Sequence, residues 1–363
     1  MSSLRPGTVS LRKQATITDV ARQARVSPAT VSRVLNDVPR SVAPSLRRRV
    51  LKAAKGLDYR PNALARSLLD KRTHTLGLLI TDIANSFFAE IMRGIEEVCR
   101  KERYSLFVCN TDRNPETIAD YIDVLREKRV DGVLVIAGGV PGRQPFDLLP
   151  SRGIPVVVLG RFDAPLPAVR IDYVKGGRAA ASHLIALGHT QTALLLGPKT
   201  STTSQDLLRG YRQALNEHDI ALSPDCVLHG NGLAAGAMPL AERVLRLAKR
   251  PTGIFASNDN VAMAVIRAAL SLGLQVPQDV SVIGCDGIQL GSFMNPALTT
   301  LRLPIHQMGV TVADMILRLI AGETVEDTVW FQPELIVRGS TAPLASRPVR
   351  RCKGHDRARD ADP

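Results

Sequence analysis

The chain has 363 residues, enough for two or three domains, and carries a formal net charge of +13. Residues 1–74 hold 16 lysines and arginines against 4 aspartates and glutamates, a net of +12, whereas residues 75–340 have a net of −2. A basic segment joined to a near-neutral body is typical of proteins that bind a phosphate backbone, and the lack of any apolar run of about 18 residues argues against a membrane span.

Residues 16–36 have the pattern of two short helices joined by a tight turn. Thr16 and Asp19 have the spacing of a capping box at the start of the first helix. Ser27 is a favourable N-cap for the second helix, and Pro28 takes its first position, where a missing N–H is tolerated. Apolar residues recur at helical spacing on one face of each helix: Val20, Ala21, Ala24, Val31, Val34 and Leu35.

The second helix leaves a small polar face exposed, formed by Ala29, Thr30, Ser32 and Arg33. Such a helix fits the major groove of DNA and presents its N-terminal residues to base edges. An ordinary amphipathic hairpin is the alternative. The caps, the small-residue turn and the polar face together favour a helix-turn-helix.

The rest of the basic segment divides into three parts. We expect a disordered arm over residues 1–14, a third head helix over 44–57, and a hinge helix with linker over 61–74, so that the head covers 15–60. The hinge helix has only about two turns and is marginal without packing partners. The third helix is rich in basic residues, which either contact phosphates or form a solvated face: Arg47, Arg48, Arg49, Lys52 and Lys55.

Residues 75–340 alternate between strand and helix patterns, which predicts parallel sheets covered by helices on both faces. Strand-like runs occupy 76–80, 105–109, 132–136, 156–159, 192–196, 253–256 and 280–284. Helical patterns occupy 88–99, 118–125, 179–187, 207–215 and 261–272. These units are too many for one compact sheet, so we predict two doubly wound α/β lobes. Residues 341–363 are charged and are expected to form a disordered tail.

Residues for catalysis or metal binding do not emerge from the sequence. The five cysteines are scattered without a CxxC pair, which suits free thiols in a reducing cytoplasm. The seven histidines lack metal-ligand spacing, and no nucleophile-elbow, phosphate-loop or zinc-protease motif is present. We therefore expect neither an enzyme nor a cofactor. Aromatic residues make up only 4% of the chain, which disfavours binding single strands by base stacking.

Taken in order, the motifs resemble the lactose/galactose repressor (LacI/GalR) family. The head motif lies in residues 17–36 and the hinge motif, YRPNALARSL, in residues 59–68. Further matches are NSFF at 85–88, KRVDG at 128–132, SND at 257–259 and VPQDVSVIG at 276–284. The resemblance covers roughly residues 15–340, and by eye it is nearest to the ribose- and purine-responsive branches.

The resemblance implies a homodimer that binds a pseudo-palindromic DNA operator. Arg33 would bond a guanine edge with two hydrogen bonds, and Ala29 would touch a thymine methyl group. Leu68 would wedge into the minor groove and kink the duplex. The implied DNA-contacting residues are Pro28, Ala29, Thr30, Ser32 and Arg33 in the head, with Asn62, Ala65 and Leu68 in the hinge.

The resemblance also implies lobes like those of periplasmic sugar-binding proteins, with a small-molecule effector between them. The chain would cross between lobes near 171–175, 301–305 and 331–333. The implied effector-binding residues are Phe87, Phe88, Arg161, Asp172, Asn258 and Asp286. Alternatively, the phenylalanines are core residues at a helix start, while Asn258 lies in a turn and Asp286 caps a loop.

Leu207 departs from the family pattern, because many members have an arginine there that anchors ligand hydroxyls. Either the effector is not a simple neutral sugar, or Thr203, Gln205 or Arg209 replaces the arginine. We expect a cytoplasmic regulator, a repressor controlled by a sugar-like effector. The alternatives are a purine-type repressor that needs a corepressor and an architectural DNA-binding protein without an effector.

Overall fold

A computed structural model describes residues 15–35, 42–59, 72–112, 114–137, 139 and 142–344. The chain divides into two compact units, Met1–Thr73 and His74–Pro363. The predicted arm (1–14), most of the predicted hinge (60–71) and the tail from 345 onward lie outside the described residues.

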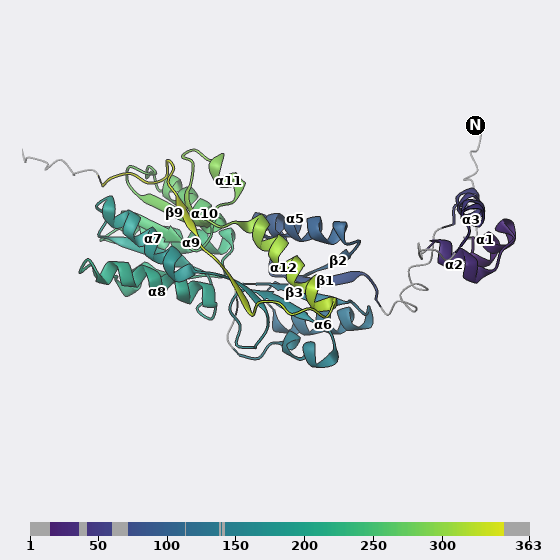
Figure 1. The fold of residues 1–363 in the computed structure, drawn as a ribbon. Coiled ribbons are helices and arrows are strands. Elements are labelled where there is room, and N and C mark those ends of the chain that lie inside the picture. The colour runs from purple at the N-terminus through teal and green to yellow at the C-terminus, as the bar shows by residue number, and fades with distance from the viewer. Residues whose placement is uncertain are drawn as a thin grey trace, which may run out of the picture. The chain divides into compact units, whose positions relative to one another are not determined.

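The first unit contains the predicted helix-turn-helix and third helix (Figure 1). Its helices are α1 (Ile17–Ala24), α2 (Pro28–Leu35) and α3 (Pro44–Gly56). The capping box is present, since the Thr16 amide donates to Asp19 at 2.9 Å and the Asp19 amide donates to the Thr16 hydroxyl at 3.3 Å. A core built on the fully buried Val20, Val31 and Val50 joins the three helices.

The second unit contains two six-stranded sheets, which define lobe 1 and lobe 2. Lobe 1 has the strand order β11-β5-β4-β3-β1-β2, and lobe 2 has the order β12-β10-β9-β8-β6-β7. All described strand pairs are parallel except β10 with β12. The lobe 1 strands are β1 (Thr75–Ile80), β2 (Ser105–Asn110), β3 (Gly132–Ile136), β4 (Val156–Leu159), β5 (Ala168–Ile171) and β11 (Thr328–Phe331). Those of lobe 2 are β6 (Thr192–Leu196), β7 (Val227–His229), β8 (Gly253–Ala256), β9 (Ser281–Asp286), β10 (Thr299–Arg302) and β12 (Glu334–Ile336).

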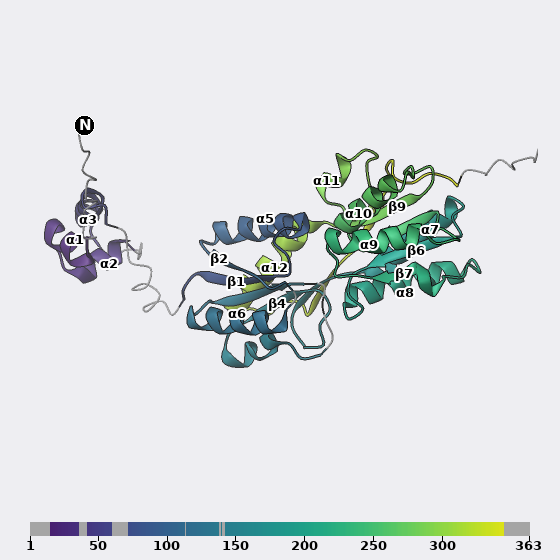
Figure 2. The same cartoon turned by 180° about the vertical axis from the view of Figure 1, so that it is seen from behind.

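Helices cover both faces of each sheet (Figures 1 and 2). In lobe 1, α5 (Ser86–Lys101) and α12 (Ile305–Ile320) pack on one face and α6 (Pro115–Glu127) on the other. In lobe 2 the pairs are α7 (Tyr173–Ala186) with α8 (Thr202–Asn216), and α9 (Ala234–Leu245) with α10 (Asp259–Ser271). Shorter elements are α11 (Gln289–Ser292), η1 (Pro145–Leu148), η2 (Pro150–Arg152) and η3 (Pro224–Cys226). The predicted doubly wound architecture is confirmed.

The chain crosses between the lobes at three points, all of them predicted. It passes from β5 to α7, from β10 to α12, and from β11 to β12. Lobe 1 therefore takes α12 and β11 from a late part of the sequence. The sequence pattern did not predict strands β5, β7, β10, β11 and β12 or helices α9, α11 and α12.

Residues 341–344, which the sequence places at the start of the predicted tail, are among the described residues. Residues 341–344 pack along lobe 2, where the Leu344 amide donates to the Leu187 carbonyl at 2.8 Å. The ring of His183 bonds the Thr341 hydroxyl at 3.0 Å. These bonds give residues 341–344 fixed partners, so the body extends to at least Leu344.

Two helix pairs are in direct backbone contact through glycines. A Cβ atom added at Gly210 in α8 would overlap the Val174 carbonyl of α7, and one added at Gly177 would overlap the Leu207 carbonyl. Gly94 of α5 and Gly309 of α12 form the equivalent contact in lobe 1. Close approach of this kind excludes any larger residue, because the opposing group is backbone and cannot move aside alone.

Candidate functional site

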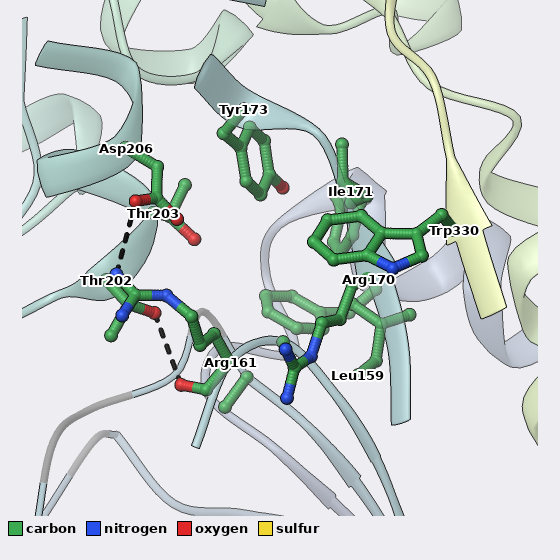
Figure 3. Close-up of a pocket in the computed structure, with 13 residues that line it drawn as sticks. Leu159, Arg161, Arg170, Ile171, Tyr173, Thr202, Thr203, Asp206 and Trp330 are labelled. Carbon is green, nitrogen blue, oxygen red and sulfur yellow. Dashed lines mark hydrogen bonds and ion pairs between the residues drawn. The ribbon is translucent and has the colours of Figure 1, made fainter. Parts of the chain in front are cut away.

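A pocket lies where the carboxyl ends of lobe 1 strands meet the first turn of α8 (Figure 3). This is the crevice in which parallel α/β sheets ordinarily bind ligands. The cavity volume is about 60 Å³ with the lobes as they stand, which is room for a few water molecules, so a ring-sized ligand would require the lobes to move apart. Its lining residues are Phe87, Phe88, Ala137, Leu159, Gly160, Arg161, Arg170, Ile171, Tyr173, Thr202, Thr203, Asp206 and Trp330.

Aromatic rings form two sides of the pocket. Phe87 and Phe88 begin α5 behind the N-cap Asn85, and their rings meet edge to face with centroids 5.2 Å apart. Both are less than 10% exposed, so each also belongs to the lobe 1 core. Trp330 lies on β11 and is 55% exposed, which leaves much of its indole ring free to contact a ligand.

Contacts from the first turns of α8 join the two lobes across the pocket. Asp206 pairs with Arg161 of lobe 1 at 3.1 Å and with Arg209 of its own helix at 3.0 Å. The Thr202 hydroxyl donates to the Arg161 carbonyl at 3.3 Å, and the Thr202 amide donates to the Gly139 carbonyl at 3.2 Å. The Asp206 side chain is only 14% exposed, so solvent weakens its ion pairs less than those on the surface.

Beside the pocket, two buried aspartates lie close together at the carboxyl end of β9. Asp259 accepts hydrogen bonds from the amides of Gly287 and Ile288, both at 2.8 Å, and from the Thr300 hydroxyl at 2.6 Å. Burial raises the pKa of Asp259 to about 6 despite these donors. Burial and the neighbouring charge of Asp259 hold the pKa of Asp286 well above its usual range.

Acidification is expected to stabilise the body through Asp259. Its pKa is about 6 in the folded protein against an ordinary value of 3.8, so the free-energy cost of burying its charge is present above pH 6 and absent below pH 3.8. Relief of that cost amounts to about 3 kcal/mol when it is complete, below pH 3.8, and to about 1.4 kcal/mol between pH 7.5 and pH 5. The measurement is the free energy of unfolding in urea at about pH 5 and about pH 7.5.

The control for this prediction is Asp259→Asn, which cannot titrate. Burial lowers the pKa of His183 and of His189, so both residues reduce the free energy of unfolding as the pH falls. This reduction is the same in the wild type and in Asp259→Asn. The wild type should therefore gain more than the variant as the pH falls. Equal pH dependence in the two proteins would contradict the role given to Asp259.

The structure brings three of the six predicted effector residues into the pocket lining, namely Phe87, Phe88 and Arg161. Asp172 is the N-cap of α7 and accepts from the Lys175 amide at 2.9 Å. Asn258 is the N-cap of α10, accepting from the Val261 amide at 2.8 Å and donating to the Gly232 carbonyl at 2.9 Å. Asp286 is not in the pocket lining; burial and, to a smaller extent, Asp286 raise the pKa of the lining residue Tyr173. Their contact with an effector remains a prediction.

Leu207 does not face the pocket. It is fully buried in the lobe 2 core between α7 and α8, and the pocket-facing residues of that helix are Thr202, Thr203 and Asp206. Among the predicted replacements for the family arginine, Thr203 lines the pocket and Arg209 reaches it through Asp206. The Gln205 side chain instead donates to the Lys199 carbonyl at 3.0 Å.

Sequence reasoning missed Asp206, Arg170 and Trp330. Asp206 directly precedes Leu207, the position already compared with the family arginine, so the neighbouring residue was the available signal. Arg170 and Trp330 lie on two strands that the pattern analysis did not recognise, and they are direct neighbours in the β5–β11 register.

The predicted DNA-reading face is accessible in the first unit. Pro28, Ala29 and Arg33 are exposed on α2, while Thr30 and Ser32 are half-buried. The Thr30 amide donates to the Ser27 hydroxyl at 3.2 Å, which caps the helix as expected. The predicted hinge contacts Asn62, Ala65 and Leu68 lie outside the described residues.

Together these features define a regulator class in which a helix-turn-helix head is attached to a body of periplasmic-binding-protein type. Residues 16–62 match the model for bacterial regulatory proteins of the lacI family, and residues 181–341 match a periplasmic binding protein-like domain. The chain belongs to the lacI family.

The chain is similar to curated members of that family over most of its length. It is 38% identical to an HTH-type transcriptional repressor PurR of Aliivibrio fischeri (strain MJ11), over 90% of this chain and 98% of the relative. A PurR repressor of Vibrio campbellii is also 38% identical, over 91% and 99% of the two chains.

Solved structures agree with the family assignment. A lac repressor dimer bound to operator and the anti-inducer ONPF is 28% identical with a TM-score of 0.82, covering 91% of this chain and all of that one. The transcriptional regulator CelR in complex with cellobiose is 28% identical with a TM-score of 0.69, covering 90% and 99%. Within the described ranges, no helix combines the length and apolarity needed to cross a membrane.

Proposed function

We propose that this protein is a cytoplasmic transcriptional repressor that binds a two-fold-symmetric DNA operator as a homodimer. The observation that carries the proposal is the α2 face, where exposed Arg33 follows a capped helix start in a strongly basic unit. The repressor names of the relatives and the operator-bound lac repressor dimer support it. The proposed DNA contacts are Pro28, Ala29, Thr30, Ser32 and Arg33, together with Asn62, Ala65 and Leu68 of the hinge.

A small molecule in the interlobe pocket is proposed to control DNA affinity. Thr202 and Asp206 of lobe 2 contact Arg161 and Gly139 of lobe 1, so the pocket surface depends on the angle between the lobes. A ligand that binds one lobe angle better than another shifts the population toward that angle. The repressor–operator and regulator–cellobiose complexes among the similar structures support this coupling of ligand to DNA binding. No catalytic step is part of the proposal.

Replacing Arg33 with alanine is expected to relax base preference at one position in each operator half-site. A bidentate arginine–guanine contact contributes about 1–3 kcal/mol of discrimination, which the alanine variant loses. The measurement is selection of bound sequences from a random duplex library, followed by gel-shift titration of single-base variants of the selected site.

The matched control is Lys52→Ala on α3, where an exposed positive charge is removed from the same unit. A lysine that contacts only phosphate should lower affinity for all sequences alike or leave it unchanged. An Arg33→Ala protein that selects the same half-site with the same stringency as the wild type would overturn the role of Arg33. Selection of no sequence by the wild type would overturn operator binding itself.

A further inference from the structure

Resting on the proposed function, we propose that the effector is a ring compound carrying an acidic group, a carboxylate or a phosphate. Arg170 receives the acidic group, Arg161 adds a second positive charge to the lining, and Trp330 contacts the ring (Figure 3). Phe88, which also lines the pocket, contacts the ring as well. The charges and open hydrogen-bonding sites of the pocket lead to this assignment.

Arg170 is the pocket residue that most clearly lacks a hydrogen-bond acceptor. Its Nε atom is buried, and among the described residues it has no hydrogen-bond partner and its guanidinium has no ion pair. A buried guanidinium N–H left without an acceptor costs free energy, which a bound acceptor would recover. A carboxylate or phosphate meets this need best, since both match the guanidinium with paired, charge-assisted hydrogen bonds.

The neighbouring strand holds Arg170 in position for such a contact. Trp330 on β11 is its register partner on β5, and the guanidinium carbon lies 5.8 Å from the indole centroid. A cation placed over a ring face keeps the N–H groups in the guanidinium plane available for hydrogen bonds. The same tryptophan, 55% exposed, offers apolar surface to the ring of the ligand.

The charge balance of the pocket favours an anion. Arg161 and Arg170 line it, whereas the single described carboxylate in the lining is Asp206, which already pairs with Arg161 and Arg209. A sugar hydroxyl can accept from an arginine, but it carries no charge and its own proton needs an acceptor. The one lining carboxylate is already paired with Arg161 and Arg209. An acid instead adds the missing negative charge.

The N-terminus of helix α8 also favours an anion in the pocket. Its first turn faces the pocket through Thr202 and Thr203, and that turn contains no acidic residue. The N-terminus of a 15-residue helix carries partial positive charge, which favours an anion nearby.

Isothermal titration calorimetry with matched pairs of compounds tests the proposal on the full-length protein. The pairs are glucuronate with glucose, ribose 5-phosphate with ribose, and orotate with uracil, so that carboxylate and phosphate are distinguished. We expect the acidic member of at least one pair to bind about tenfold more tightly than its neutral partner. Arg170→Gln should weaken that acid about ten- to a hundredfold and leave the neutral compound unchanged.

Two further variants make the result specific. Arg170→Lys keeps the charge without the guanidinium fork and should give an intermediate loss, which separates binding from misfolding. Arg178→Gln removes an arginine paired with Glu217 outside the pocket lining and should leave binding unchanged. A neutral member that binds as tightly as its acid, or an Arg170→Gln protein with unchanged affinity for the acid, overturns the proposal while leaving effector control intact. If none of the compounds binds, the result contradicts both the proposed small-molecule control and the proposed acidic effector.

Discussion

Replacing Gly210 with alanine is expected to destabilise the body by about 3 kcal/mol or more. The added methyl group would overlap the Val174 carbonyl, and both groups are attached to helix backbone. Helices α7 and α8 must therefore separate, which opens the core around Leu207 and Tyr211, two fully buried residues. Urea unfolding followed by circular dichroism measures the loss.

The control for Gly210→Ala is Ser182→Ala, on the exposed side of α7. It adds no atom to the helix contact and should change the free energy of unfolding by less than about 0.5 kcal/mol. Equal stabilities for Gly210→Ala and Ser182→Ala would show that the two helices are not in backbone contact.

Replacing Asp259 with alanine is expected to cost about 3 kcal/mol or more at neutral pH. The substitution leaves the amides of Gly287 and Ile288 and the hydroxyl of Thr300 without their acceptor in a buried loop. Because this loop begins directly after Asp286, its disorder should also weaken effector binding. Urea unfolding and ligand titration of the variant measure the two effects.

Asparagine at the same position separates the hydrogen bonds of Asp259 from its charge. Its amide oxygen can accept from Gly287 and Ile288, and its nitrogen can donate to the Thr300 hydroxyl. Asp259→Asn should therefore be at least as stable as the wild type at neutral pH, because it keeps these hydrogen bonds and removes the buried charge. If asparagine is as damaging as alanine, the hydrogen-bond account fails.

Local signals in the sequence were sufficient for the head and for most of the body. The Thr16–Asp19 spacing identified a capping box that the structure contains, and Ser27 caps α2 as its position indicated. Central strands such as β3 are continuous apolar runs because both faces are covered, so they stood out from their surroundings. The alternation of strand and helix then predicted two wound lobes.

The remaining features depend on contacts between distant parts of the chain. Strand β11 has mixed burial, since it lies at the edge of its sheet, and therefore lacks a clear apolar pattern. Arg170 and Trp330 are 160 positions apart and become neighbours only through strand pairing. The local backbone also decides whether a polar side chain caps a helix or faces a ligand, and residue type alone does not reveal which. Asp172 and Asn258 are examples, since both cap helices.

The pairing of Trp330 with Arg170 has a practical consequence. Trp330 is the only tryptophan among the 363 residues, and it lies half-exposed in the pocket lining. The intrinsic tryptophan fluorescence of the whole protein therefore originates at the pocket. The unlabelled protein thus carries an optical probe of pocket occupancy, with no second tryptophan to obscure it.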